Sequence, residues 1–189
     1  MTKRDKSINM LIEWFSNMIL FTPIQSYQFS NNNCNDQILA EDGNNFSNWL
    51  KNILNTEPDF YIPLTKTLSQ VIPDFNKIHF ISNDKRDKRD KRDKNNIQIK
   101  FANNKKQMTL DFIDLSDGEK MTFIISTIMC WAEYSDKTSF VFIDEPINYI
   151  GYDIAEIIIQ NFIKKTKNNS VQLLITSKQR FNNIQTFQI

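Results

Sequence analysis

Apolar side chains recur every three to four residues in five stretches of the chain, and this spacing predicts amphipathic helices. The first runs from about Ser7 to Phe21, ahead of Pro23, and the next two cover about 46–54 and 64–72. These three predict a helical subdomain formed by residues 7–75. A fourth helix begins after Leu115 and is apolar on most sides, which predicts burial; the fifth covers about 154–162.

Five shorter apolar runs predict strands. Residues 78–81 form the first, and 97–101 and 108–113 follow as a hairpin with a polar turn. The runs 139–143 and 171–175 are continuously apolar, which is typical of parallel strands buried on both faces. Because helix and strand alternate in this last part, we predict an α/β fold, with a partly parallel sheet flanked by helices.

The only low-complexity segment is an Asp-Lys-Arg repeat at 84–94, with seven basic and four acidic residues. It divides the chain into a largely helical part at 1–83, a charged loop at 84–96 and an α/β lobe at 97–189. The repeat is interpreted as a solvated loop or as a contact for polyphosphate or nucleic acid. The loop is favoured, because interleaved Asp residues weaken the positive field and no aromatic residue is present for base stacking.

Composition excludes several classes of protein. With 23 basic and 22 acidic residues the formal charge is +1, which argues against a dedicated nucleic-acid binder. No apolar stretch approaches the length of a membrane span, and no secretory signal is visible. Cys34 and Cys130 lack metal-ligand spacing and form no disulfide framework, so a reducing cytoplasm is the expected location and no membrane partner is expected.

The strongest candidate for chemistry is Asp144-Glu145-Pro146, directly after the apolar run 139–143. A buried parallel strand delivers the residues that follow it to the carboxyl edge of the sheet, where α/β proteins bind ligands. Two adjacent carboxylates there call for a counter-charge, and hydrated Mg²⁺ with substrate phosphates is the usual one. Asp144 would hold the metal and Glu145 would orient an attacking water. The alternative is a strand that simply ends in an acidic turn.

The second candidate is the segment Leu115-Ser-Asp-Gly-Glu119. Ser116 and Glu119 have the spacing of a capping box, which explains both residues without any function. Gly118 is unfavourable inside a helix and indicates a close approach by another group. A helix start with a hydroxyl and free amides also suits a phosphate. Ser116, Asp117, Gly118 and Glu119 are therefore candidate phosphate-binding residues as well as a cap.

The remaining candidates have simpler explanations. Trp14, Trp49 and Trp131 lie on or beside helical apolar faces and are predicted to be core residues. His79 is the sole histidine and falls in a strand-like run, so it is interpreted as structural; one histidine cannot form a His-rich metal site. The three glycines are too far apart for a Gly-rich phosphate loop, and no G-x-x-x-x-G-K-[ST] motif occurs.

The order and spacing of these motifs resemble the C-terminal half of an ABC-type ATPase head. The nearest resemblance is to the AAA ATPases of the SMC, RecF and OLD-like group. These proteins carry L-S-D-G or L-S-S-G-E-K, then hhhhDEPE and then hhhTTHS, where this chain has 115–120, Phe140–Pro146 and 173–178. Residues 39–50 are similar to the "dG-N-l" segment of the group, and the stretch up to Pro73-Asp-Phe75 is similar to its "i.P.f" segment.

The resemblance implies a P-loop NTPase-like fold with bound ATP and Mg²⁺. Two such heads enclose ATP: the Walker A loop of one grips the phosphates, and the signature motif of the other caps the γ-phosphate. It thus implies that Ser116, Asp117, Gly118 and Glu119 contact ATP held by a partner. Asp144 would bind Mg²⁺ as the Walker B aspartate, and Glu145 would be catalytic. Lys178 stands where the group has its switch histidine and would reach a phosphate.

Two main functions stay open. The first is an ATPase component that contributes signature motif and Walker B to a hydrolase, with Walker A supplied by another ATPase head, in a homo- or hetero-oligomer. The second is a catalytically degenerate, ATPase-like protein that docks on a complete ATPase. A gene remnant that folds but does little is a third. DNA repair or antiviral defence, and thus nucleic acid as a partner, is suggested by the resemblance alone.

Overall fold

The computed structural model describes residues 3–23, 37–80, 97–102, 107–138, 140–166, 171–182 and 184–185, with side chains from residue 6 onward. Cys34, the Asp-Lys-Arg repeat and the predicted hairpin turn lie outside these ranges.

A parallel sheet forms the part of the fold that carries the acidic motif. Its strands are β1 (Met18–Phe21), β5 (Phe140–Ile143) and β6 (Gln172–Ile175), in the order β1-β5-β6. Both pairings are parallel, and Phe21 aligns with Ile143, which aligns with Ile175. All three strands therefore end at one edge. The predicted α/β fold, with a parallel sheet flanked by helices, is confirmed.

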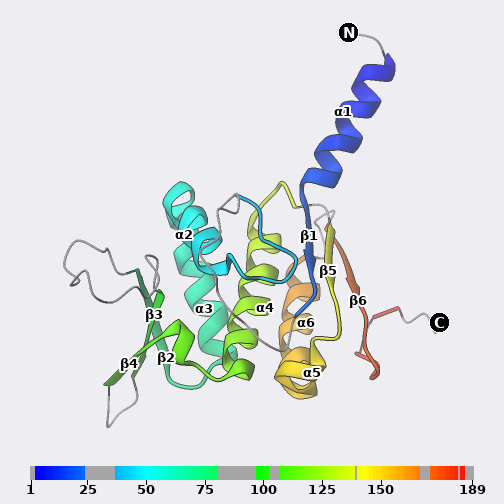
Figure 1. The fold of residues 1–189 in the computed structure, drawn as a ribbon. Coiled ribbons are helices and arrows are strands. Elements are labelled where there is room, and N and C mark those ends of the chain that lie inside the picture. Colours follow the sequence, from blue (N-terminus) through cyan, green and yellow to red (C-terminus); the bar gives the residue numbers. More distant parts are fainter. Residues whose placement is uncertain are drawn as a thin grey trace.

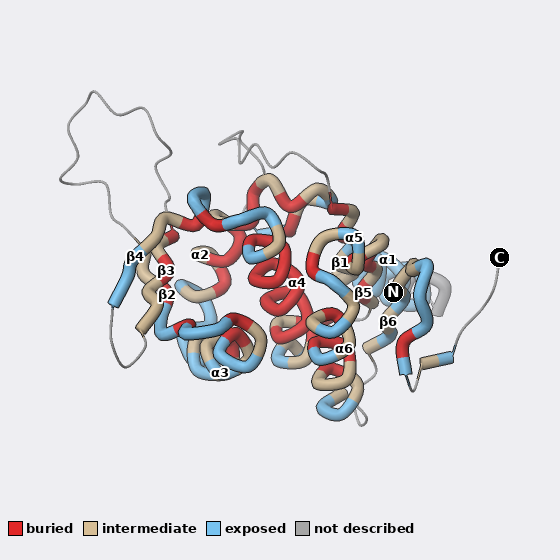
Figure 2. Tube along the Cα trace, turned by 90° about the horizontal axis from the view of Figure 1, so that it is seen from below, coloured by how far each residue is buried: buried red, intermediate tan, exposed pale blue. Residues whose placement is uncertain are grey.

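Two helices, α4 (Asp117–Tyr134) and α6 (Tyr152–Thr166), pack on one face of this sheet, and the short α5 (Ile147–Ile150) lies at the carboxyl ends of the strands (Figure 1). Val141 and Ile143 of β5 are fully buried. Helix α4 is buried along most of its length, as Figure 2 shows, because its sequence is apolar on most sides.

The N-terminal part contains helices α1 (Lys3–Ser16), α2 (Phe46–Thr56) and α3 (Tyr61–Val71), with a 3-10 turn η1 (Pro58–Phe60) before α3. The predicted helix at 7–21 is wrong over its last residues. It ends at Ser16, where the Asn17 side-chain amide donates to the Glu13 carbonyl oxygen at 2.8 Å. The next four apolar residues instead pair with β5 as β1, so this part also contributes a strand.

A second, antiparallel sheet has the order β2-β3-β4. Its strands are β2 (Phe75–Phe80), β3 (Ile97–Ala102) and β4 (Gln107–Asp111). The pairing of β3 with β4 confirms the predicted hairpin. The predicted strand 108–113 ends earlier, because η3 (Phe112–Asp114) turns Phe112 into the core, where its ring lies 5.5 Å from that of Phe46.

The predicted core tryptophans are only partly correct. Trp49 is buried and Trp131 is half-buried, whereas Trp14 on α1 is 39% exposed. Trp14 differs because α1 extends away from the body of the molecule (Figure 1), so its apolar face meets no described helix. None of the described helices is long and apolar enough to cross a membrane.

Candidate functional site

The two acidic residues of the candidate site lie between the ends of three parallel strands. The backbone amide of Asp144 donates to the carbonyl oxygen of Phe21, at the end of β1, over 3.0 Å. The amide of Glu145 donates to the hydroxyl of Thr176, beyond the end of β6, over 2.9 Å. Backbone and side-chain bonds to both neighbouring strands therefore fix the position of this acidic pair.

Thr176 links the two acidic residues. Its hydroxyl donates to Oδ1 of Asp144 while it accepts from the Glu145 amide. A hydroxyl that donates and accepts in this way holds the Asp144 carboxylate in one orientation. Sequence reasoning did not single out Thr176. A polar residue directly after a strand that the sequence predicts to be buried, at the level of Asp144, was the available signal.

Glu145 has an unusual backbone and an unpaired carboxylate. Its φ is 44°, in the left-handed region that L residues other than Asn and Asp adopt rarely. Its Oε2 atom is buried without a hydrogen-bond partner in the structure. Both features cost stability, and such features cluster at functional sites. Together they mark Glu145 as the most unusual residue at this edge.

The start of α4 is a complete capping box. The Ser116 hydroxyl accepts from the Glu119 amide at 3.3 Å and donates to Glu119 Oε2 at 2.6 Å. The Ser116 amide donates to the same oxygen at 2.9 Å. Asp117 forms an ion pair with Lys120 at 3.5 Å between Oδ1 and Nζ. The hydroxyl of Ser116 is therefore already bonded within the helix start, in agreement with the predicted cap.

Gly118 is explained by a contact within the chain. A Cβ atom at this position would lie 3.2 Å from the carbonyl oxygen of Tyr149 on α5. A cavity of about 140 Å³ lies beside this contact, bounded by the end of α3, the start of α4 and α5. Only Pro146 separates Glu145 from α5. The close contact at Gly118 therefore places the start of α4 against the segment that follows the acidic pair.

The predicted site residues thus fall into two groups. Asp144 and Glu145 lie at the carboxyl edge of the sheet, and Lys178 is exposed in the bend that follows β6. The segment 116–119 forms the start of α4 and reaches α5 through Gly118. The structure records no direct bond between the two groups.

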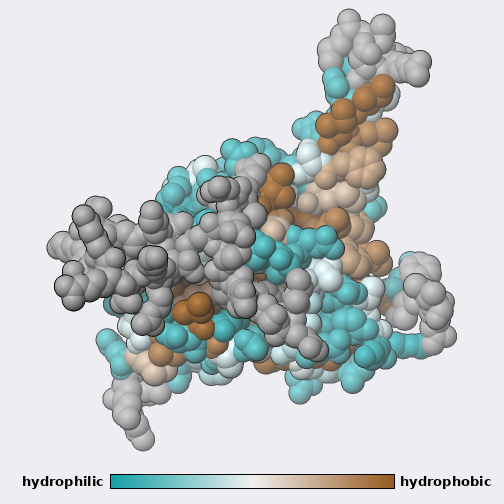
Figure 3. All heavy atoms as spheres, viewed as in Figure 1, coloured by the Kyte–Doolittle hydropathy of each residue, from teal (hydrophilic) through white to brown (hydrophobic). Residues whose placement is uncertain are grey.

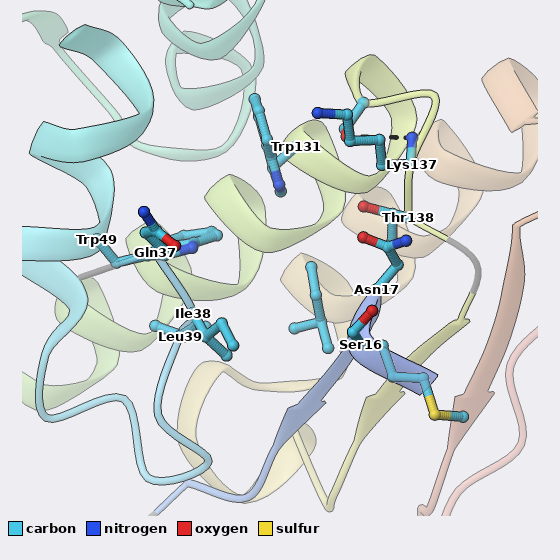
Figure 4. A pocket seen from close by; sticks show the side chains of 12 residues that line it. Ser16, Asn17, Gln37, Ile38, Leu39, Trp49, Trp131, Lys137 and Thr138 are labelled. Carbon is cyan, nitrogen blue, oxygen red and sulfur yellow. Dashed lines mark hydrogen bonds between the residues drawn. The ribbon is translucent and has the colours of Figure 1, made fainter. Parts of the chain in front are cut away.

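A larger cavity, of about 180 Å³, lies at the opposite end of the strands (Figure 4). Trp49 from α2 and Trp131 from α4 line it, together with Asn17 before β1 and Thr138 before β5. Asn17 and Thr138 lie before the starts of β1 and β5, whereas the acidic pair lies beyond the end of β5. The cavity is therefore separate from the candidate site.

The residues of the acidic pair suit a phosphate-bound cation better than a protein-enclosed one. Among the described residues, no group of three or more His, Cys, Asp or Glu side chains could hold a metal ion. Mg²⁺ needs only one or two carboxylates when water and phosphate oxygens complete its octahedron. Oδ2 of Asp144 and the unpaired Oε2 of Glu145 are the oxygens that could serve such an ion directly or through water.

No family model and no curated protein sequence matches the chain. Solved structures of SMC ATPase heads are similar to it at low scores. One, from work on ATP-driven dimerization and DNA-stimulated activation of SMC ATPases, is 12% identical with a TM-score of 0.47, over 68% of this chain and 73% of that chain.

Two further structures give similar values. The Smc head domain with a coiled coil and joint derived from Pyrococcus yayanosii is 12% identical with a TM-score of 0.45, over 66% of this chain and 23% of that chain. The Smc head bound to the C-terminal winged-helix domain of ScpA is 17% identical with a TM-score of 0.46, over 67% and 37%.

Proposed function

We propose that this chain is a component of an ABC-type ATPase. In this proposal, Asp144 and Glu145 serve Mg-ATP, Ser116–Glu119 acts as a signature motif, and a partner chain supplies the Walker A loop. The observation that carries the proposal is the buried, unpaired Oε2 of Glu145 on a left-handed backbone. A structural turn would not require an arrangement that costs stability twice.

The proposed roles follow from the contacts of each residue. Asp144, held by Thr176, would coordinate Mg²⁺, which supplies charge neutralisation for the phosphates. Glu145 would accept a hydrogen bond from the attacking water, because its Oε2 has no partner within the chain. Lys178, exposed beyond the end of β6, would approach a phosphate as a point charge.

A second candidate function has its own support. The Ser116 hydroxyl is bonded to Glu119, and Gly118 is explained by Tyr149, so the start of α4 is accounted for without a nucleotide. This favours a degenerate, ATPase-like protein that docks on a complete ATPase. The two candidates differ in whether the acidic pair binds Mg-ATP.

Calorimetric titration with Mg-ATP tests the proposal, on the chain alone and on the chain assembled with a Walker A-containing ATPase head. We expect Mg²⁺-dependent binding that Asp144→Asn weakens at least tenfold, about 1.4 kcal/mol, by removing the proposed metal ligand. Glu145→Gln should keep the bound nucleotide and lose its hydrolysis, because the amide no longer accepts the water's proton. Asp153→Asn, at the exposed start of α6, is the matched control and should bind like the wild type.

Two outcomes argue against the ATPase assignment. Binding that Asp144→Asn leaves unchanged would place the nucleotide elsewhere. No detectable effect of the chain on Mg-ATP binding or hydrolysis by the assembled complex would favour the docking protein, whereas absent binding by the chain alone is expected of half a site. The mass measured on the same sample would show whether a partner is already bound.

A further inference from the structure

The face of the parallel sheet that is turned away from α4 and α6 is apolar. Side chains alternate along a strand, so the residues between the buried positions of β5 point to this outer face. Leu20, Phe142 and Leu174 form one row across the three strands. Leu20 is 45% exposed and Leu174 is 49% exposed. We call the six residues of this face the outer sheet face: Met18, Leu20, Phe140, Phe142, Gln172 and Leu174.

This exposure is unusual for a parallel sheet. Parallel sheets occur almost only with both faces covered, and their strands are accordingly apolar on both sides. No described helix of the chain lies on the outer sheet face (Figure 1), and none of its residues is charged. The sequence of β5 is therefore that of a strand in a parallel sheet whose two faces are both covered.

Helix α1 complements the outer sheet face, because its own apolar face packs on no sheet. Its large apolar residues are exposed by 39% to 70% and face solvent along the helix (Figure 3): Ile8, Met10, Leu11, Ile12, Trp14 and Phe15. Ile8, Leu11, Ile12 and Phe15 have the spacing of one helical stripe. Trp14 lies 6.3 Å from Phe140 between ring centroids, so the apolar surface of α1 continues onto the outer sheet face.

Within one chain, α1 cannot fold back onto this face in its present form. Only Asn17 separates α1 from β1, whereas helix-to-strand connections that reverse the chain need about two to six residues. The helix end is also fixed, because Ser16 Oγ and Asn17 Nδ2 both donate to the Glu13 carbonyl oxygen, at 3.0 and 2.8 Å. The helix thus continues away from the sheet.

We propose that two copies of this chain form a dimer in which α1 of each copy covers the outer sheet face of the other. At 14 residues, α1 is about 21 Å long, which is enough to cross three strands of four residues each. The exchange is reciprocal, so one two-fold axis satisfies both helices and both sheet faces. The dimer does not depend on nucleotide.

The apolar area available matches what a stable dimer buries. The four stripe residues of α1 with Leu20 and Leu174 make six large side chains at about half exposure. With on the order of 200 Å² for each such side chain when free, they offer about 600 Å² per copy, or roughly 1,200 Å² for the pair. Stable interfaces bury from roughly 1,200 Å² in total, so this area reaches what a stable dimer needs.

Sedimentation or light scattering on the full chain, with and without Mg-ATP, tests the dimer. One copy has a mass of 22.4 kDa, and we expect twice this value at micromolar concentration in both conditions. Two variants should each give monomers: Leu11→Glu with Phe15→Glu on the helix, and Leu174→Glu on the sheet. Ile62→Glu is the matched control, because Ile62 is 71% exposed on α3, and it should stay dimeric.

All altered positions are exposed, and circular dichroism with urea unfolding confirms that each variant is folded. A monomeric wild type would overturn the proposal. A dimer that dissociates in the helix variant but persists in Leu174→Glu would also overturn it, because the two α1 helices would then pair with each other. Leu20→Lys provides a second change on the sheet, so the result does not depend on one variant.

Discussion

At the residue scale, Glu145 is held in place by its neighbours rather than by its own preferences. A left-handed backbone costs an L residue about 1–2 kcal/mol, and a buried carboxylate oxygen without a partner adds to this. Two hydrogen bonds restrain this backbone: the Glu145 amide donates to the Thr176 hydroxyl, and the Asp144 amide donates to the Phe21 carbonyl oxygen. The arrangement costs stability, in agreement with the catalytic role that we propose for Glu145.

We therefore expect Glu145→Gly to stabilise the protein. Glycine adopts positive φ without a steric penalty, and the unpaired oxygen is removed, so the free energy of unfolding should rise by about 1 kcal/mol in urea denaturation. Asp74→Gly is the matched control, since Asp74 has φ 58° but is exposed in a turn, and it should gain less. A loss of stability in Glu145→Gly would contradict a strained, functional Glu145.

The buried thiol of Cys130 makes the stability of the protein depend on pH. Burial raises the pKa of this thiol to about 11, and the hydrogen bond from the Thr67 hydroxyl, at 3.5 Å, opposes this shift. At a pH between 9.0 and about 11, the thiol therefore keeps its proton in the folded state and loses it in the unfolded chain, where its pKa is 9.0. The stability supplied by this group is present below pH 9 and is lost as the pH rises towards 11.

Urea unfolding at pH 8 and pH 10.5 tests this effect. We expect the wild type to lose on the order of 2 kcal/mol more than Cys130→Ala between the two values. The comparison is needed because Tyr134 and Tyr152 also have raised pKa values and give a loss of the same sign. Equal losses in both proteins would contradict a role for the thiol.

At the scale of elements, the start of α4 combines a cap with a close contact to α5. The Ser116–Glu119 box satisfies the first amides of a helix that is buried along most of its length. Gly118 allows that helix to approach Tyr149. Both residues therefore have structural roles that any phosphate contact would have to share.

Ser116 variants separate these roles. Ser116→Ala should lower the free energy of unfolding by about 1 kcal/mol, because a capping side chain is lost. Ser116→Thr should keep most of the stability, since its hydroxyl can still accept from the Glu119 amide and donate to the Glu119 carboxylate, and yet its extra methyl group would crowd a γ-phosphate. Ser69→Ala on α3, where the hydroxyl bonds only to the Lys66 carbonyl oxygen in the described contacts, should leave the stability nearly unchanged.

Urea denaturation measures the stabilities, and the ATPase rate of the assembled complex measures the function. A threonine variant that is stable and keeps full activity would limit Ser116 to the role of a cap. A stable threonine variant without activity would support the signature motif.

At the scale of the whole molecule, the described helices α4 and α6 cover one face of the parallel sheet, no described helix covers the other, and α1 lies on neither. The core continues on the far side of α4, where Phe46, Phe112 and Phe123 from α2, η3 and α4 meet in edge and tilted contacts. The open face and α1 account for much of the exposed apolar surface among the described residues. Solution mass is thus the property that most directly reports how this fold is completed.

The sequence by itself determined the elements with strong local signals. Helical spacing was sufficient for α2, α3, α4 and α6, and two continuous apolar runs were sufficient for β5 and β6. The cap of α4 was also readable, because its partners are three residues apart. These features depend on neighbours along the chain, so the local pattern carries the information.

Only the tertiary structure decided the features that depend on distant partners. Residues 18–21 continue a helical pattern, yet they form β1 because β5, 122 residues further along the chain, offers backbone hydrogen bonds, as in the Leu20–Phe142 register. Thr176 became part of the site because β6 ends beside β5. Gly118 was explained by Tyr149, and Trp14 proved exposed, since each depends on what packs against it and not on its own segment.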